Sequence, residues 1–529
     1  MRCLPERLLH GFLFAGFFFL LLGCESGTMS TRAPNIVIIL ADDLGYSDIG
    51  SFGGEIKTPY LDMLASRGLR FTQFYNAARC CPTRASLLTG RYPHQAGMGG
   101  MVSAVDSEPT PGPYQGYLAE NVATIAELLQ QANYNTYLSG KWHVGEKPDH
   151  WPLKRGFDHY FGLISGASSY YEVIKDQPRV RQMALDDDPW EPPVENFYMT
   201  DAITDHATGF IRDHVDNNSR RKPFFLYVPY TAPHWPLHAL ESDIARYEGV
   251  YDAGWDSVRT ARYERLVQSG LIDGKWALPE RPASIPAWSD VPDKHTWSRR
   301  MEVYAAMVDR MDQGIGRILK ALDETRAIRN TLIIFLSDNG GSSENVLGRA
   351  LHDESRKIGE KGSYDAYREP WAFVSNTPFR RYKSWTHEGG IATPMIAYWM
   401  RGIKEPGRVI TEPGHLIDLM ATSLELAGVS DTPVGDQSSA LPGLSLVPVF
   451  QNEPRASHPA LFWEHLGARA ARKGNWKIVM GRQEEAWELY NMEADRNERH
   501  NVADSYPGIV EEMEAEWNDW AEEVGVFEK

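Results

Sequence analysis

Residues 35–43 read NIVIILADD, an apolar run that ends directly in two aspartates. The run is uncharged and rich in β-branched side chains, and this pattern predicts a strand that is buried on both faces. Residues 331–339 read TLIIFLSDN and repeat the arrangement, with Ser337, Asp338 and Asn339 at the end. Ligands bind beyond the carboxyl ends of such buried strands in α/β sheets. Both stretches therefore predict polar residues gathered at one edge of a sheet.

Two further apolar segments lead into polar loops. Residues 135–138 run into SGKWH (139–143), and residues 224–228 run into a loop that includes Ala232, Pro233 and His234. Helical patterns lie between these strands at residues 122–132 and 301–322 and after them at residues 416–427. Strands that alternate with helices predict a largely parallel sheet that is covered by helices.

Length and composition restrict the class of protein. The 529 residues correspond to three or four units of about 150 residues, or to one large α/β enzyme with a small appendage. A content of 42% hydrophobic and 24% charged residues excludes a disordered, collagen-like or coiled-coil chain. The formal net charge of −17 argues against a nucleic-acid partner. An anionic substrate would need a local cationic pocket.

The N-terminal residues predict a targeting segment. Arg2 and Arg7 precede an apolar run of 13 residues (11–23), which is shorter than the roughly 20 residues that span a bilayer. This pattern is typical of a secretory signal. The sequence LLGC (21–24) resembles a bacterial lipobox, which implies a signal peptide over residues 1–23 and a lipid on Cys24. We therefore expect an exported bacterial lipoprotein, held at a membrane of the cell envelope (periplasm, outer membrane or cell surface). The alternative is an ordinary signal peptide that contains a cysteine.

The polar strand ends offer a candidate metal site. Asp42, Asp43, Asp338 and Asn339 form an all-oxygen donor set, which suits a hard cation such as calcium or magnesium. Each acidic pair could instead be a helix cap or a surface turn. Two pairs that each follow a buried strand favour the metal site.

The segment RCCPTRASLLTGR (79–91) contains two adjacent cysteines. Pro82 suits the first turn of a helix, so Cys80 and Cys81 are expected at a helix N-terminus. Free backbone N–H groups at such a terminus favour an anion. The alternative is a pair of buried free thiols that only cap the helix.

The same segment resembles a known signature. Cys-x-Pro-x-Arg followed by Leu-x-Gly-Arg is similar to the motif of type I (formylglycine-dependent) sulfatases, in the alkaline-phosphatase superfamily. Residues 251–256 and 299–312 resemble more narrowly the bacterial arylsulfatase-like branch of that family. Cys80 matches the cysteine that this family oxidises to formylglycine. Cys81 does not match, because Thr83 rather than proline lies two residues after it. Further matches follow in order: 35–50, 139–145, 232–234, 251–256, 299–312, 337–341, and Lys383 with 388–390.

The resemblance implies a fold and its domains. The expected fold class is α/β, with a large, mostly parallel mixed sheet flanked by helices and a small C-terminal antiparallel sheet plus helix. The catalytic α/β domain is expected over residues 34–450 and an α+β subdomain over 451–529. Strand-like residues 476–480 and an amphipathic acidic helix at 509–523 suit that subdomain.

The resemblance also implies a nucleophile and its cofactor. Formylglycine at Cys80 would coordinate a divalent cation, Ca²⁺ rather than Mg²⁺, together with Asp42, Asp43, Asp338 and Asn339. The hydrated aldehyde carries two hydroxyls. One attacks sulfur, and the other then loses its proton so that the aldehyde reforms and sulfate leaves.

Five further side chains complete the implied site. Three cations would make the pocket attract a sulfate ester: Arg84, Lys141 and Lys383. His143 is the candidate to take the proton of the hydrate, and His234 the candidate to protonate the leaving alcohol, although the two roles can be exchanged. An extended backbone at 141–143 would turn Lys141 and His143 to one side and Trp142 to the other.

The implied function is hydrolysis of sulfate esters. A lipid-anchored exported chain with 16 tryptophans suggests a sulfated polysaccharide or oligosaccharide as substrate. A formylglycine-generating or anaerobic maturation enzyme would be a necessary partner. One alternative is a formylglycine-dependent phosphonate monoester or phosphodiester hydrolase, which uses the same nucleophile and metal pairs. A second alternative is a non-catalytic surface lipoprotein that binds glycans.

Overall fold

The structure is a computed structural model that describes residues 32–104, 106–175, 181–217, 222–347, 351–429 and 440–527. The expected signal peptide (1–23) and the lipidation site Cys24 lie outside these ranges. Among the described residues, no helix combines the length and the apolar character that a membrane span requires.

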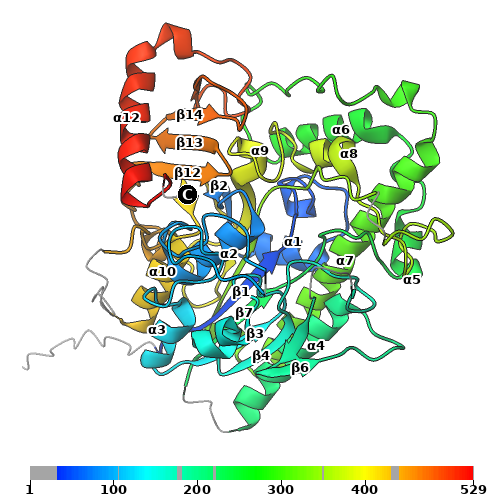
Figure 1. The fold of residues 1–529 in the computed structure, drawn as a ribbon, viewed down its shortest axis with the longest axis vertical. Coiled ribbons are helices and arrows are strands. Elements are labelled where there is room, and N and C mark those ends of the chain that lie inside the picture. The colour runs from blue at the N-terminus through cyan, green and yellow to red at the C-terminus, as the bar shows by residue number, and fades with distance from the viewer. Residues whose placement is uncertain are drawn as a thin grey trace, which may run out of the picture. The chain divides into compact units, whose positions relative to one another are not determined.

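A large mixed sheet forms the centre of the fold (Figure 1). Its strands are β1 (Asn35–Ala41), β2 (Leu69–Tyr75), β3 (Asn135–Ser139), β4 (His159–Leu163), β5 (Met183–Leu185), β6 (Asp188–Trp190), β7 (Phe224–Pro229), β8 (Thr331–Ser337), β9 (Ala392–Tyr398), β10 (Val409–Ile410) and β11 (Gly414–His415). Their order is β10-β2-β9-β8-β1-β7-β3-β4-β5-β6, with β11 paired to β2. The central pairs β8–β1, β1–β7, β7–β3 and β3–β4 are parallel, whereas β9 and β5 run antiparallel to their neighbours. The mostly parallel mixed sheet is therefore confirmed.

Strand β1 lies in the middle of this sheet and sets the position of the polar edge. Its residues from Ile36 to Ala41 are fully buried, because β7 and β8 flank it and helices cover both faces. The parallel register pairs Ala41 with Ser337 of β8. Asp42 and Asp338 consequently leave the sheet side by side.

Helices pack on the sheet and on one another. They are α1 (Pro59–Ser66), α2 (Cys80–Thr89), α3 (Ile125–Gln131), α4 (Met199–Asp216), α5 (Glu241–Ile244), α6 (Gly254–Gln268), α7 (Lys294–Glu324), α8 (Arg368–Ser375), α9 (Glu388–Ile391), α10 (Asp418–Ala427), α11 (Val447–Phe450) and α12 (Pro507–Glu523). Helix α4 contacts α7 and strands β3 and β7, and helix α3 contacts α10 and β3. Helix α3 begins at Ile125 rather than at Val122, because Thr124 and Glu127 form a capping box at its start.

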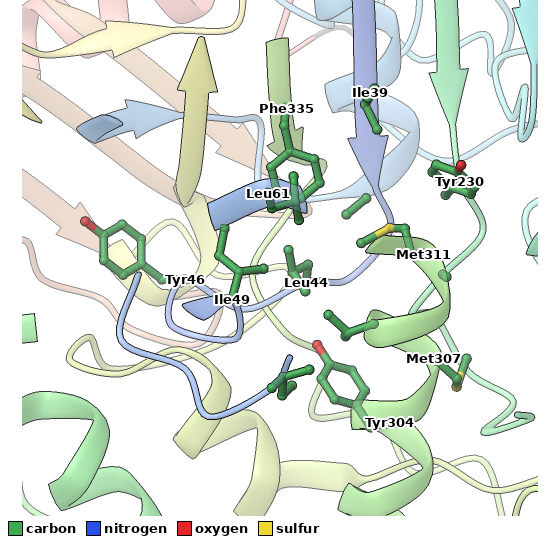
Figure 2. Close-up of a cluster of buried hydrophobic side chains, with 14 of the residues drawn as sticks. Ile39, Leu44, Tyr46, Ile49, Leu61, Tyr230, Tyr304, Met307, Met311 and Phe335 are labelled. Atoms are coloured by element: carbon green, nitrogen blue, oxygen red, sulfur yellow. The ribbon is translucent and has the colours of Figure 1, made fainter. Parts of the chain in front are cut away.

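A buried cluster beneath the end of β1 holds the loop that follows it (Figure 2). Leu44 and Ile49 from this loop share the core with Met307 and Met311 of α7. Tyr304, also on α7, donates a hydrogen bond from its Oη to Asp48 Oδ2 (2.7 Å). Helix α7 thus fixes the backbone that carries the two aspartates.

The C-terminal residues form a second, smaller sheet. Strands β12 (Leu461–His465), β13 (Ala468–Lys473), β14 (Trp476–Met480) and β15 (Glu488–Asn491) pair antiparallel in sequence order, and α12 packs on β13 and β14 (Figure 1). This arrangement confirms the expected antiparallel sheet plus helix. Buried Lys477 of β14 bonds Glu388 of α9 (2.9 Å) and ties this part to the large sheet. The described residues from Pro34 onward form one compact unit, and the division at residue 450 stays a prediction.

Candidate active site

Four of the five predicted metal ligands, namely Asp42, Asp43, Asp338 and Asn339, lie together at the polar edge of the large sheet. Asp43 donates its backbone N–H to Asp338 Oδ1 (3.1 Å), and Asn339 donates from Nδ2 to Asp43 Oδ1 (2.7 Å). All four side chains, including Asp42, are buried. The two strand ends therefore bring a pure oxygen donor set into one pocket, as the sequence predicts.

The donor set fits a hard cation. Asp42 Oδ1 and Asn339 Oδ1 are buried and have no hydrogen-bond partner among the described residues. Burial and the neighbouring carboxylate of Asp338 raise the pKa of Asp42 well above its ordinary value. Orphaned oxygens and crowded buried carboxylates are what a bound Ca²⁺ or Mg²⁺ would relieve.

Three buried cations surround these carboxylates. The pairs are Lys141 Nζ with Asp42 Oδ2 (2.6 Å), Arg84 Nη2 with Asp338 Oδ2 (2.9 Å), and Lys383 Nζ with Asp43 Oδ2 (2.8 Å). Burial alone would lower the pKa of Lys383, but Asp43 and Glu344 reverse this effect and raise it. Lys383 is therefore fully protonated at neutral pH.

Arg84 lies on helix α2, one helical turn after Cys80. Its guanidinium bonds Asp338 and donates from Nη1 to the carbonyl of Lys141 (3.0 Å). Arg84 thus joins α2 to the carboxylates and to the loop after β3.

The predicted nucleophile occupies the first position of α2. Cys80 and Cys81 are both buried and free. A hydrogen bond with Cys81 lowers the pKa of Cys80 well below its ordinary value, and the charge of Lys141 acts in the same direction, whereas burial opposes them. Burial and Cys80 raise the pKa of Cys81. The environment therefore activates the first cysteine of the pair and not the second.

His143 reaches Cys80 through an irregular backbone. Strand β3 ends at Ser139, and His143 has a positive φ of 57°, so the extended conformation considered for residues 141–143 is wrong. Trp142 is nevertheless turned away, with its Nε1 donating to the carbonyl of His150 (2.9 Å). The left-handed backbone, held by a hydrogen bond from His143 N to Ile164 O (3.0 Å), directs the imidazole into the site.

The imidazole of His143 is neutral at neutral pH. Burial lowers its pKa to about 4, with Lys141 adding to the effect and Cys80 opposing it. Gly166 makes room for the ring, because a Cβ at that position would lie 2.2 Å from His143 Nε2. A neutral imidazole beside the residue at position 80 can accept a proton from it.

His234 enters the same pocket from the loop after β7. Its Nδ1 lies 2.6 Å from the carbonyl of Trp235, and its Nε2 lies 3.6 Å from Asp43 Oδ2. Burial lowers its pKa to about 3, with Lys383 adding to the effect and Asp43 opposing it. A neutral His234 is a weak proton donor at neutral pH, so its role as the acid stays a prediction.

Three residues around Lys383 are not among those predicted from the sequence, namely Arg79, Trp235 and Glu344. Glu344 accepts hydrogen bonds from Trp235 Nε1 (2.7 Å) and Arg79 Nη2 (3.1 Å), and it lies 3.4 Å from Lys383 Nζ. Arg79 directly precedes Cys80, and Glu344 belongs to the polar loop that follows Asn339. Charged residues next to two recognised motifs were the available signal.

Comparisons with known proteins agree with this geometry. Residues 34–429 match the model of the sulfatase family. An uncharacterised sulfatase of Schizosaccharomyces pombe is 34% identical, over 94% of this chain and 95% of that protein. The arylsulfatase of Klebsiella aerogenes is 34% identical, over 78% of this chain and 91% of that protein.

A solved structure has the same fold. The structure of Ps i-CgsB in complex with k-i-k-neocarrahexaose superposes with a TM-score of 0.67, at 29% identity, over 93% of each chain. The fold, the buried constellation and the family match agree. The chain belongs to the sulfatase family of the alkaline-phosphatase superfamily and is a sulfuric ester hydrolase.

Proposed function

We propose that this sulfatase removes sulfate from a sulfated polysaccharide or oligosaccharide, with formylglycine made from Cys80 as nucleophile and Ca²⁺ as the cation. The observation that carries the proposal is the convergence of Cys80, His143 and a carboxylate cluster with paired cations in one buried pocket. The oligosaccharide bound in the Ps i-CgsB complex supports a carbohydrate substrate.

The charge of the pocket suits a sulfate ester. Three carboxylates and a divalent cation leave a charge of about −1, and three cationic side chains raise the total to about +2. When bound, the cation would polarise a sulfate oxygen and lower the pKa of the formylglycine hydroxyl. An acidic protein can thereby bind an anionic ester at this one place.

The side chains have separable tasks in this proposal. His143, neutral and next to position 80, accepts the proton of the formylglycine hydrate. Lys383, protonated and nearly buried, donates a hydrogen bond to the bridging or a peripheral sulfate oxygen. His234 is the second group that can hydrogen-bond the leaving alcohol. Lys141 and Arg84 keep Asp42 and Asp338 oriented.

We also propose that the enzyme acts at the cell envelope as a lipoprotein. Cleavage before Cys24 and a lipid on its thiol would hold the mature chain at a membrane. A formylglycine-generating or anaerobic maturation enzyme would convert Cys80. The wild-type chain should incorporate a labelled fatty acid and a Cys24→Ser variant should not, and equal labelling of both would contradict the lipid at Cys24.

The substrate is tested by measuring inorganic sulfate released from a panel of sulfated polysaccharides and oligosaccharides. We expect release from at least one glycan by the wild type and none by Cys80→Ala. Hydrolysis of small aryl sulfates with no release from any glycan would overturn the carbohydrate substrate. Equal release by Cys80→Ala would overturn the nucleophile.

A further inference from the structure

The carboxylate of Glu344 lies beside Lys383 and is more exposed than the charged groups around it. Its side chain is 29% exposed, whereas those of Lys383 and Asp43 are each 2% exposed. Glu344 Oε2 is 3.4 Å from Lys383 Nζ, the group proposed to bind a sulfate oxygen. A bound sulfate group would therefore lie within a few ångströms of a fixed negative charge.

Hydrogen bonds hold this carboxylate in place. Trp235 Nε1 and Ser342 Oγ donate to Oε2 (2.7 and 3.1 Å), and Arg79 Nη2 donates to Oε1 (3.1 Å). Burial would raise the pKa of Glu344, but Lys383 and Arg79 lower it well below its ordinary value. Glu344 is thus ionised at neutral pH and held in one orientation.

An anion beside a cationic pocket affects ligands according to their charge. A sulfate monoester carries one negative charge, whereas inorganic sulfate and a phosphate monoester at neutral pH carry about two. Coulomb repulsion is proportional to the charge of the ligand, so a dianion incurs twice the unfavourable free energy of a monoanion. If the carboxylate weakens the binding of a monoanion by a given factor, it therefore weakens the binding of a dianion by the square of that factor. A neighbouring carboxylate consequently separates monoanions from dianions.

We propose that Glu344 is a specificity residue that makes the pocket favour monoanionic sulfate esters over dianions, namely the product sulfate and phosphate monoesters. The same charge would speed the release of the product. This inference rests on the proposed function, because it requires the sulfate group to bind beside Lys383.

The test compares inhibition by a monoanion and by a dianion. The Glu344→Gln substitution removes the charge and keeps an oxygen that accepts the bond from Trp235. If removal of the charge tightens the Ki of benzenesulfonate about fivefold, the Ki of inorganic sulfate and of phenyl phosphate should tighten about 25-fold. The ratio of the two Ki values should therefore shift about fivefold.

Three control variants separate the effect of the charge of Glu344 from structural effects of the substitution. Glu344→Asp keeps the charge and should keep the wild-type ratio. Ser342→Ala removes one hydrogen bond to Glu344 without a change in charge, and Glu453→Gln removes a charge from an exposed pair with Lys404. Both should leave the ratio unchanged.

The outcomes separate the role of Glu344 from the placement of sulfate beside Lys383. Equal tightening for all three anions in Glu344→Gln, or an unchanged ratio, would overturn the role of Glu344. If none of these anions inhibits the wild type, the placement of sulfate beside Lys383 fails. The proposed function itself fails only if the wild type releases no sulfate from any glycan.

Discussion

Gly166 offers the sharpest test of the position of His143. A Cβ on residue 166 would lie 2.2 Å from Nε2 and 2.4 Å from Cε1 of the imidazole, whereas ordinary contacts begin near 3.4 Å. In a Gly166→Ala variant the ring must therefore move by about 1 Å. Such a misplacement of a reacting group costs about 100-fold in rate.

The expected result is a loss in kcat of about 100-fold with little change in KM, because His143 is proposed to accept a proton and not to bind sulfate. Steady-state hydrolysis of 4-nitrophenyl sulfate measures both constants. Gly209→Ala is the matched control, since a Cβ there meets nothing within 4 Å and the residue lies within α4. The control should keep its kcat and gain about 0.5–1 kcal/mol in stability.

A double-mutant cycle excludes an indirect effect. In a His143→Ala background, Gly166→Ala should cost little more, because the group that it displaces is absent. The reasoning is refuted if Gly166→Ala keeps the wild-type kcat. It is also refuted if the substitution lowers kcat equally with and without the imidazole.

Three further predictions concern pH, metal and stability. Burial lowers the pKa of His143 to about 4, and the neutral imidazole is the proposed base. The value of kcat/KM should therefore fall only as the pH drops towards about 4. A fall in kcat/KM that begins near pH 6.5 would contradict this prediction. Chelation should abolish activity, and added Ca²⁺ should restore it. Asn339→Ala should raise the Ca²⁺ concentration for half-maximal activity by 10-fold or more, on the order seen for altered metal shells. Activity that resists chelators would exclude the metal site. Asp312 accepts hydrogen bonds from the backbone of Tyr60 and Leu61, and burial raises its pKa to about 7. Its folded-state pKa exceeds the unfolded value, so up to about 4 kcal/mol of stability is present below about pH 4 and lost as the pH rises to about 7. Urea unfolding of Asp312→Asn should show a weaker decline over this range, and equal declines would contradict the assignment.

The sequence alone predicts the structural features that depend on residues close together in the chain. The uninterrupted apolar run of β1 indicates burial on both faces, and the aspartates directly after it must then lie at the sheet edge. Pro82 likewise places Cys80 at the start of a helix, where the structure has it. These residues need only their neighbours in the chain to be interpreted.

Other features depend on contacts between distant segments. The left-handed backbone of His143 is fixed by Ile164, and the space for its ring is provided by Gly166, neither of which has a local signature. Arg84 bonds Asp338, which lies 254 positions away in the sequence. Glu344 can be assigned to the site only from the fold, which places it beside Lys383 and Arg79.

The central claim is that Cys80 becomes the catalytic aldehyde. Trypsin cleaves after Arg79 and Arg84, so it releases a peptide that contains both adjacent cysteines. Mass spectrometry of this peptide, from protein made with a maturation enzyme, should show a loss of about 18 Da at Cys80 and an unmodified, alkylatable thiol at Cys81. The converted fraction should scale with kcat across preparations. A fully active enzyme with an unmodified thiol at position 80 would contradict the account.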